Sequence, residues 1–286
     1  MRKPRPVRHA GPAASSKAGH EADRRRTTHE RRGRGQQEPA NDKGLIYGIG
    51  PVLEALRSKA RRIEKIIIAE GTRERRLDEI FDLARDAGVR VDKSSREDLT
   101  RMTGPDATHQ GIAAVASAAE YSSVDEILRE AAIPLLVILD GVEDPRNLGA
   151  VIRTAECAGA DGVIIPDRRA VGLTETAAKS SAGATEYLKV AKTTNINRLI
   201  DDLKKQNIWV VGTSGDASMD YTKWDWAQPS ALVLGAEGSG LHRLVKENCD
   251  VLVKIPMYGK IESLNVSVAA GVVLFEARRQ RLEKGG

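Results

Sequence analysis

The sequence predicts an α/β fold whose larger part is built around a parallel β-sheet. Short apolar runs such as PLLVILD (134–140) and ALVLG (231–235) have the length of buried strands. Helical patterns separate these runs, and the order strand, loop, helix, strand over residues 134–165 is that of a βαβ unit. Because such a crossover joins parallel strands, we expect a layered sheet with ligands bound outside the carboxyl ends of its strands.

Residues 44–118 predict a smaller α/β domain. Its triple Ile in RIEKIIIAE indicates a strand buried on both faces. The expected elements are a helix from Pro51 within 44–57, a strand at 62–70, a helix at 73–88, a strand at 89–91, a helix at 95–102 and a strand at 111–117. The turn THQG (108–111) has two interpretations, a hydrogen-bonded turn or an RNA contact through its His and Gln.

Residues 119–132 predict a linker that runs into a short helix, and residues 133–286 predict the second domain. This domain has expected helices at 148–158, 174–181 and 195–206, and expected strands at 134–140, 162–165, 208–213, 231–235 and 251–255. A last helix follows Ser263, which we expect to be its N-cap. The run LNVSVAAGVVLF from Leu264 has no charge, so we expect that helix to have no face in water.

The positive charge is concentrated at the amino terminus. Residues 1–43 have a net charge of +7, whereas the remainder has a net charge of −2. This tail contains no Ile, Leu, Phe, Trp or Tyr, so we expect it to be disordered. It is either an arm for a polyanion such as RNA, a solubilising segment, or an organelle-targeting peptide, although its acidic residues argue against targeting.

The composition argues against several classes of site. The only cysteines, Cys157 and Cys249, form no CxxC pair, which argues against a disulfide framework and a zinc site and favours a reducing compartment. His109 and His242 are the only histidines outside the tail, and no His or Cys neighbours either one, so we expect no metal. No apolar run reaches membrane-spanning length.

Three polar loops follow expected strands. They are Asp140–Asn147 with Arg153 on the next helix, GAEGSG at 235–240, and Pro256–Asn265. GAEGSG is neither the GxGxxG of a dinucleotide site nor a Walker loop, but its glycines allow a ligand to approach the backbone closely. At the third loop, Ser263 and Asn265 either hold a polar ligand or only cap the helix and fix the loop.

The three loops in this order resemble the three signature motifs of the SpoU family of RNA ribose 2′-O-methyltransferases. The matching stretches are DPRNLGAVIRTAECAGADGVIIP, LVLGAEGSGL and KIPMYGKIESLNVSVAAGVVLFEA, and the resemblance covers residues 134–280. YGIGPVLEALR and HQGI are similar to the substrate-binding domain of the family branch that methylates a guanosine of large-subunit ribosomal RNA. No motif position departs from the family pattern, although the tail lies outside it.

The resemblance implies a carboxyl-terminal trefoil knot that binds S-adenosylmethionine, with no metal. It also implies a cytoplasmic homodimer with active sites near the subunit interface, an RNA partner, and a first domain similar to a ribosomal-protein-like RNA-binding fold. Carried over by motif, the cofactor-binding residues are Thr213, Gly235, Ile255, Leu264 and Asn265. The catalytic residues are Asn147, Arg153, Glu237, Ser263 and Asn265.

The family assigns Arg153 to activation of the 2′-hydroxyl. Because an Arg side chain stays protonated, we expect it to stabilise a developing 2′-oxyanion or to act through an RNA phosphate. Asn147 would orient Arg153 or the ribose, and Glu237 would anchor the first loop. Ser263 would contact the substrate or Arg153. For Glu237 and Ser263 a purely structural role is the alternative.

The sequence is also compatible with two other functions. The chain could be a non-catalytic RNA-binding or ribosome-assembly protein on the same fold, or a transfer-RNA ribose methyltransferase. The basic run of Arg61, Arg62, Arg73, Arg75 and Arg76 is either a solvated surface or an RNA contact. Trp209 lies in an apolar strand, so we expect it in the core.

Overall fold

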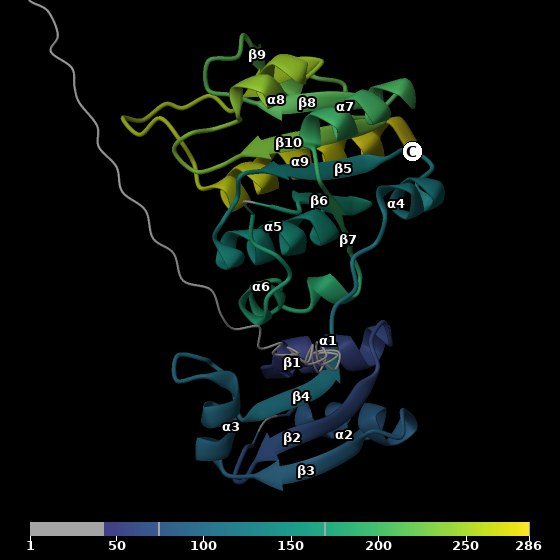
Figure 1. Cartoon of the computed structure of the whole chain (residues 1–286), viewed down its shortest axis with the longest axis vertical. Coiled ribbons are helices and arrows are strands. Elements are labelled where there is room, and N and C mark those ends of the chain that lie inside the picture. Colours follow the sequence, from purple (N-terminus) through teal and green to yellow (C-terminus); the bar gives the residue numbers. More distant parts are fainter. Residues whose placement is uncertain (1–42, 74, 169, 286) are drawn as a thin grey trace, which may run out of the picture. The chain divides into compact units, whose positions relative to one another are not determined.

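The computed structural model describes residues 43–73, 75–168 and 170–285 of the chain. These residues form two β-sheets, one of four strands and one of seven, with helices packed against them (Figure 1). The α/β architecture is therefore confirmed. The predicted disordered tail lies outside the described residues, apart from Lys43 at its end.

The smaller sheet is mixed. Its elements are β1 (Lys43–Tyr47), α1 (Ile49–Ser58), β2 (Ile63–Ala69), α2 (Leu77–Asp86), β3 (Arg90–Ser94), α3 (Arg96–Thr103) and β4 (Ile112–Ser117). The strand order is β1-β4-β2-β3, in which only β2 and β3 pair in parallel. Ile66 and Ile68 pack with α1 and α2, while Ile67 packs with Leu99 of α3 on the opposite face. The triple Ile is therefore buried on both faces, as predicted.

The larger sheet is parallel throughout. Its elements are α4 (Val124–Glu130), β5 (Leu135–Asp140), α5 (Pro145–Cys157), β6 (Gly162–Pro166), α6 (Glu175–Ser180), β7 (Lys189–Thr193), α7 (Ile196–Lys205), β8 (Trp209–Thr213), β9 (Met219–Asp220), β10 (Ser230–Gly235), α8 (Arg243–Asn248), β11 (Val251–Lys254) and α9 (Val266–Gly285). In the order β7-β6-β5-β10-β8-β11-β9, the first two polar loops follow the neighbouring central strands β5 and β10, and the third follows β11, next to the edge strand β9.

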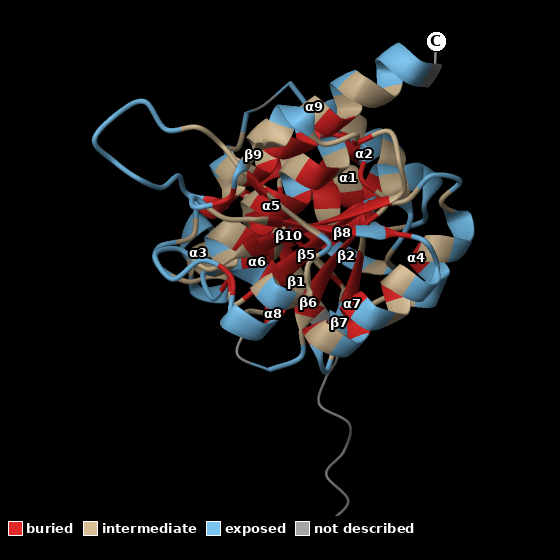
Figure 2. Ribbon diagram, turned by 90° about the horizontal axis from the view of Figure 1, so that it is seen from above, coloured by how far each residue is buried: buried red, intermediate tan, exposed pale blue. Residues whose placement is uncertain are grey.

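Helices cover both faces of the larger sheet. Residues of α5 and α9, such as Ile152 and Val273, pack with Val137 and Leu139 on one face. Residues of α4, α7 and α8, such as Ile127 and Ile200, pack with the alternating strand positions on the other face. Figure 2 shows the resulting buried strands surrounded by helices that are exposed only on their outer sides. This burial accounts for the apolar runs of the sequence.

Several elements were not predicted or begin elsewhere. β1, β7, β9 and α8 were missed because they are short and carry polar residues. Helix α5 begins at Pro145 rather than Leu148, since Asp144 caps it by accepting a hydrogen bond from Arg146 N at 2.8 Å. Helix α2 begins at Leu77, after the Arg-rich segment that we had included in it.

Two expectations about burial are wrong. Trp209 is 42 % exposed and packs edge-on against Trp224, with ring centroids 5.4 Å apart, whereas Trp226 is the fully buried tryptophan. On α9, Val268 is 50 % and Phe275 52 % exposed, so one face of this apolar helix lies at the protein surface. Along the described chain, no helix has both the length and the apolar character needed to cross a bilayer.

Candidate active site

Four strand ends form the floor of the site. β5 and β10 pair in parallel with Gly235 opposite Asp140, so the loops that follow them lie side by side. β8 and β11 continue the sheet in the same direction. The loops after β5, β10 and β11 were expected to meet here, and the loop after β8 contributes as well.

The structure joins one predicted residue from each of the three loops. Asn147 Nδ2 donates to Glu237 Oε1 at 2.8 Å, and Asn265 Nδ2 donates to Asn147 Oδ1 at 3.0 Å and also to Glu237 Oε1. These side chains come from α5, the GAEGSG loop and the residue before α9. We call them the Asn147–Glu237–Asn265 network.

Asn265 has a second role as the cap of α9. Its Oδ1 accepts a hydrogen bond from Ser267 N at 2.9 Å, and the helix begins at Val266. The expectation that Ser263 is the N-cap is therefore wrong. Because one amide serves both the helix end and the network, the start of α9 is fixed to the first two loops.

The GAEGSG loop is folded tightly on itself. Ala236 and Gly240 exchange backbone hydrogen bonds of 3.1 and 3.0 Å. A Cβ on Gly235 would lie 2.1 Å from the Gly240 carbonyl carbon, so only glycine fits at the start of this loop. The tight turn places Glu237 at the surface, where its carboxylate meets the two Asn side chains.

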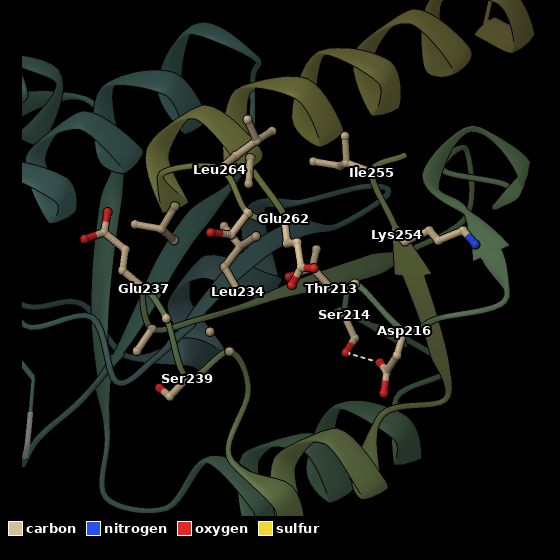
Figure 3. Close-up of a pocket in the computed structure, with 18 of the residues that line it drawn as sticks. Thr213, Ser214, Asp216, Leu234, Glu237, Ser239, Lys254, Ile255, Glu262 and Leu264 are labelled. Atoms are coloured by element: carbon tan, nitrogen blue, oxygen red, sulfur yellow. Dashed lines mark hydrogen bonds between the residues drawn. The ribbon is translucent and has the colours of Figure 1, made fainter. Parts of the chain in front are cut away.

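A cavity of about 360 Å³ lies beside the network, and we call it the first cavity. Four of the five predicted cofactor residues line it, together with Ser263, whereas Asn265 lies in the adjoining network. The lining residues that match the prediction are Thr213, Gly235, Ile255 and Leu264. Figure 3 shows Ile255 and Leu264 on one side of the cavity and Ser214 and Asp216 on another.

This lining suits S-adenosylmethionine. Leu234, Ile255 and Leu264 provide apolar contacts for an adenine, and the adjoining loop backbones can approach its polar edge. Asp216 and Glu262 add carboxylates that can accept hydrogen bonds from hydroxyl or ammonium groups. The cavity therefore fits a ligand that has both an aromatic base and polar substituents.

The Asp216 carboxylate is held on the rim of the first cavity. Lys246 Nζ contacts both of its oxygens at 2.7 Å, and Ser214 Oγ donates to it at 2.6 Å. These hydrogen bonds, that of Lys246 first, lower the pKa of Asp216 to about 2. The group is thus an anion at neutral pH. Asp216, Lys246 and Glu262 were not among the predicted site residues.

Arg153 does not join the network within the described chain. It follows Asn147 by six residues on α5, which is about 9 Å along the helix axis and about 120° around it. Its side chain is exposed. It lines neither the first cavity nor the neighbouring cavity around Glu143 and His242. Asn147 is bound to Glu237 and Asn265 instead, so the expectation that Asn147 orients Arg153 finds no support in the contacts of one chain.

The residues with two interpretations, solvated surface or RNA contact, differ in their surroundings. Arg61 is paired with the buried carboxylate of Glu186, so it is not part of an exposed basic surface, whereas Arg62, Arg73, Arg75 and Arg76 are exposed. In the 108–111 turn, His109 is 6 % exposed and both ring nitrogens have partners. His109 is therefore engaged in a hydrogen-bonded turn, as the first of the two interpretations expects.

A pair that the sequence did not reveal lies at the ends of β5 and β10. His242 donates its backbone N–H to Asp140 Oδ2 at 2.7 Å, and its Nδ1 lies 2.9 Å from Asp140 Oδ1. In the sequence these residues are far apart and His242 stands alone. Knowing that β5 and β10 are neighbours would have brought them together.

Comparison with known proteins gives the same assignment over most of the chain. Residues 134–275 match the model of the SpoU rRNA methylase family, and residues 45–122 match that of the RNA 2′-O ribose methyltransferase substrate-binding domain. The 23S rRNA (guanosine-2′-O-)-methyltransferase RlmB of Ralstonia nicotianae is 45 % identical over 239 residues, which cover 83 % of this chain and 96 % of that protein.

Solved structures of the family show the same fold. The SpoU methyltransferase AviRb of Streptomyces viridochromogenes, in complex with AdoMet, has a TM-score of 0.71 at 25 % identity and covers 85 % of this chain and 92 % of its own. The AdoMet-bound rRNA methyltransferase of Sinorhizobium meliloti has a TM-score of 0.67 at 25 % identity, covering 83 % and 87 %. The chain belongs to the SpoU family and is an S-adenosylmethionine-dependent RNA methyltransferase.

Proposed function

We propose that the protein methylates the 2′-oxygen of a guanosine in large-subunit ribosomal RNA. The observation that carries the proposal is the Asn147–Glu237–Asn265 network beside the first cavity, because it places polar groups where a ribose would meet the cofactor. The substrate-binding match at 45–122 and the named activity of the Ralstonia relative support the RNA target.

In this proposal the chain acts mainly by positioning. S-adenosylmethionine supplies a methyl group on a positively charged sulfur. The loops after β8, β10 and β11 hold the cofactor in the first cavity, and the network orients the ribose. Arg153, by its fixed positive charge, stabilises the 2′-oxygen as its proton passes to a phosphate oxygen of the RNA or to water. Transfer of the methyl group would leave S-adenosylhomocysteine.

A homodimer explains the position of Arg153. Val268 and Phe275 form an exposed apolar strip on α9, which packs against α5, the helix that carries Arg153. Burial of this strip against a second copy would remove apolar surface from water and place Arg153 near a subunit interface. We therefore assign Arg153 to an active site that is completed across this interface.

The trefoil knot is supported by the chain path. β11 lies near one edge of the sheet, whereas α9, which follows it, packs on β10 and on α5, the helix that connects β5 to β6. The chain must return across the carboxyl ends of the intervening strands to make this contact. We further propose a cytoplasmic location, because ribosomal RNA is the proposed substrate, and an RNA-attracting role for the basic tail.

The test uses the full chain, labelled S-adenosylmethionine and unmodified large-subunit ribosomal RNA, followed by mapping of 2′-O-methyl groups. We expect one methylated guanosine. Transfer RNA is the parallel substrate, and methylation of it alone would replace the proposed target. RNA binding without methylation of either RNA would favour the non-catalytic alternative.

Arg153 and the dimer are tested separately. We expect Arg153→Ala to abolish turnover while calorimetry still shows cofactor binding, and near-normal activity would remove its assigned role. We expect Phe275→Asp to shift the protein towards a monomer in analytical ultracentrifugation. Leu282→Asp, another exposed apolar position on α9, is the matched comparison for the added charge.

A further inference from the structure

A second cavity of about 410 Å³ adjoins the network on the side of the loop after β5. It shares part of its wall with the first cavity through Ala236, Glu237 and Ser239, and it also contacts Asn147. The loop of residues 141–144 and the His242 side chain form the rest of its polar lining. A nucleotide with its ribose at the network would therefore extend its base or a phosphate into this cavity.

His242 is fixed in one orientation at this cavity. Asp140, of which only 4 % is exposed, binds both the backbone N–H and the Nδ1 of His242. On another side the ring packs against Gly141, where a Cβ would lie 3.1 Å from His242 Cε1. The side chain is nevertheless 66 % exposed. The protein thus holds the ring at Nδ1 and leaves its remaining edge available.

The free polar groups of the cavity are mainly hydrogen-bond acceptors. A carboxylate can only accept a hydrogen bond, so the contact with Asp140 assigns the ring proton to Nδ1, and in this tautomer Nε2 is an acceptor. Nε2 has no partner within the described residues. The Glu143 carboxylate likewise makes no hydrogen bond or ion pair in the described chain, and Asp144 uses Oδ1 to cap α5. These carboxylates would repel a phosphate, so the cavity favours a base.

Among the RNA bases, guanine has two adjacent donors on its pairing edge, N1–H and N2–H₂. Adenine has an acceptor at N1, and uracil and cytosine each present a single donor group there. A cavity whose free polar groups are acceptors therefore complements guanine better than any other base. An acceptor facing adenine N1 would leave two lone pairs opposed, which costs binding.

We infer that the second cavity holds the base of the methylated nucleotide, and that His242 and Glu143 read it as guanine through N1–H and N2–H₂. Asp140 is the positioning residue that keeps Nε2 an acceptor. This inference rests on the proposed ribose methylation, since it places the base relative to the ribose at the network.

The experiment measures kcat/KM of the full chain on large-subunit RNA transcripts that differ only at the mapped target. The target nucleotide is guanosine, inosine, which lacks N2–H₂, or adenosine, which lacks both donors. For the wild type we expect the order guanosine, inosine, adenosine, with at least a 10-fold preference for guanosine over adenosine.

Three variants test the assigned groups. We expect His242→Ala and Glu143→Gln each to lower the ratio of kcat/KM for the guanosine transcript to kcat/KM for the adenosine transcript by about 5-fold or more. Asp140→Asn should narrow it as well, because an amide that donates to Nδ1 moves the ring proton to Nε2 and turns the acceptor into a donor. Calorimetric cofactor binding in each variant shows that the first cavity is intact.

Glu247→Gln is the matched control for Glu143→Gln, because Glu247 is an exposed carboxylate on α8 outside both cavities. It should leave the ratio unchanged. A wild type that methylates guanosine and adenosine targets equally well would overturn the inference alone, as would an unchanged ratio in His242→Ala and Glu143→Gln. Absence of methylation on every transcript would instead overturn the proposed function, and this inference with it.

Discussion

The turn at His109 and the loop end at His242 use the same side chain in opposite ways. His109 is buried, its Nδ1 accepts a hydrogen bond from Gly111 N at 3.1 Å, and its Nε2 lies 3.1 Å from Thr100 Oγ1. Among the residues that the structure describes, the His242 ring has a partner only at Nδ1, and this ring is mostly exposed beside a cavity. A histidine with both nitrogens paired stabilises a turn, whereas one with a free nitrogen is available to a ligand.

The difference extends to the surroundings of each ring. Around His109 the polar groups satisfy one another, since Thr100 Oγ1 also donates to Arg96 O at 3.0 Å. Around His242 several acceptors face open space next to the Asn147–Glu237–Asn265 network. The comparison predicts that changes near His242 affect activity and that changes near His109 affect stability.

The largest expected effect is a loss of methyl transfer when the network, which adjoins the His242 cavity, is disrupted. Glu237→Ala removes the carboxylate that accepts hydrogen bonds from both Asn147 and Asn265, so the three loops lose their common acceptor. We expect kcat/KM for methyl transfer to fall by about 100-fold or more, as when a preorganised polar group is lost. Because Glu237 is exposed, the midpoint of thermal unfolding should change little. Activity within a few-fold of wild type would contradict a role for the network.

His109→Ala should lower the stability of the protein and leave its methyl-transfer activity unchanged. The Gly111 N–H loses its acceptor inside the protein, and we expect the free energy of unfolding to fall by about 1–3 kcal/mol. Urea denaturation measures this change. Activity per folded molecule should stay normal. A raised KM for RNA with unchanged stability would instead support the RNA-contact reading of the turn.

The burial of His109 should also make the stability of the protein depend on pH. Burial, followed by the nearby charges of Arg96 and Lys179, lowers the pKa of His109. The unfolded chain therefore binds more protons below about pH 6.5, so stability is full above that pH and decreases as the pH falls through it. Urea denaturation of wild type and His109→Gln from pH 7.5 to 5 should show a smaller decrease in the variant.

The experiment compares how much the free energy of unfolding decreases between pH 7.5 and 5 in the wild type and in His109→Gln. Burial raises the pKa of the Glu175 carboxyl, and the effect of this group on the pH dependence of stability has the opposite sign. Because Glu175 is common to both chains, its contribution cancels in the difference. If the free energy of unfolding changed with pH in the same way in both proteins, His109 would not bind protons on unfolding.

The smallest effect is expected for the ion pair on α8, the helix that begins just after His242. Arg243 and Glu247 form an exposed ion pair at 2.7 Å on α8. Exposed pairs contribute only about 0–1 kcal/mol, so Glu247→Gln should alter the free energy of unfolding by less than about 1 kcal/mol and leave methylation unchanged. A clear loss of activity would mean that the functional surface extends further along α8 than the second cavity indicates.

Much of this architecture could be predicted because it depends on local patterns. Apolar runs such as PLLVILD identified the buried strands, and the motif spacing grouped Gly235, Ile255 and Leu264, which line the first cavity together. Capping was less predictable. Asp144 and Asn265, rather than Leu148 and Ser263, mark the helix starts, because several neighbouring polar residues can cap and the packing selects one.

By itself, the sequence determined the α/β class, the family and the residues of the three loops, since these follow from periodicity and motif spacing. Only the tertiary structure decided which residues meet. It placed β5 beside β10 and so joined Asp140 to His242, it joined Asn147 to Glu237 and Asn265, and it left Phe275 exposed on α9. The physical reason is that strand order and helix packing depend on contacts between segments distant in the chain, which no local pattern encodes.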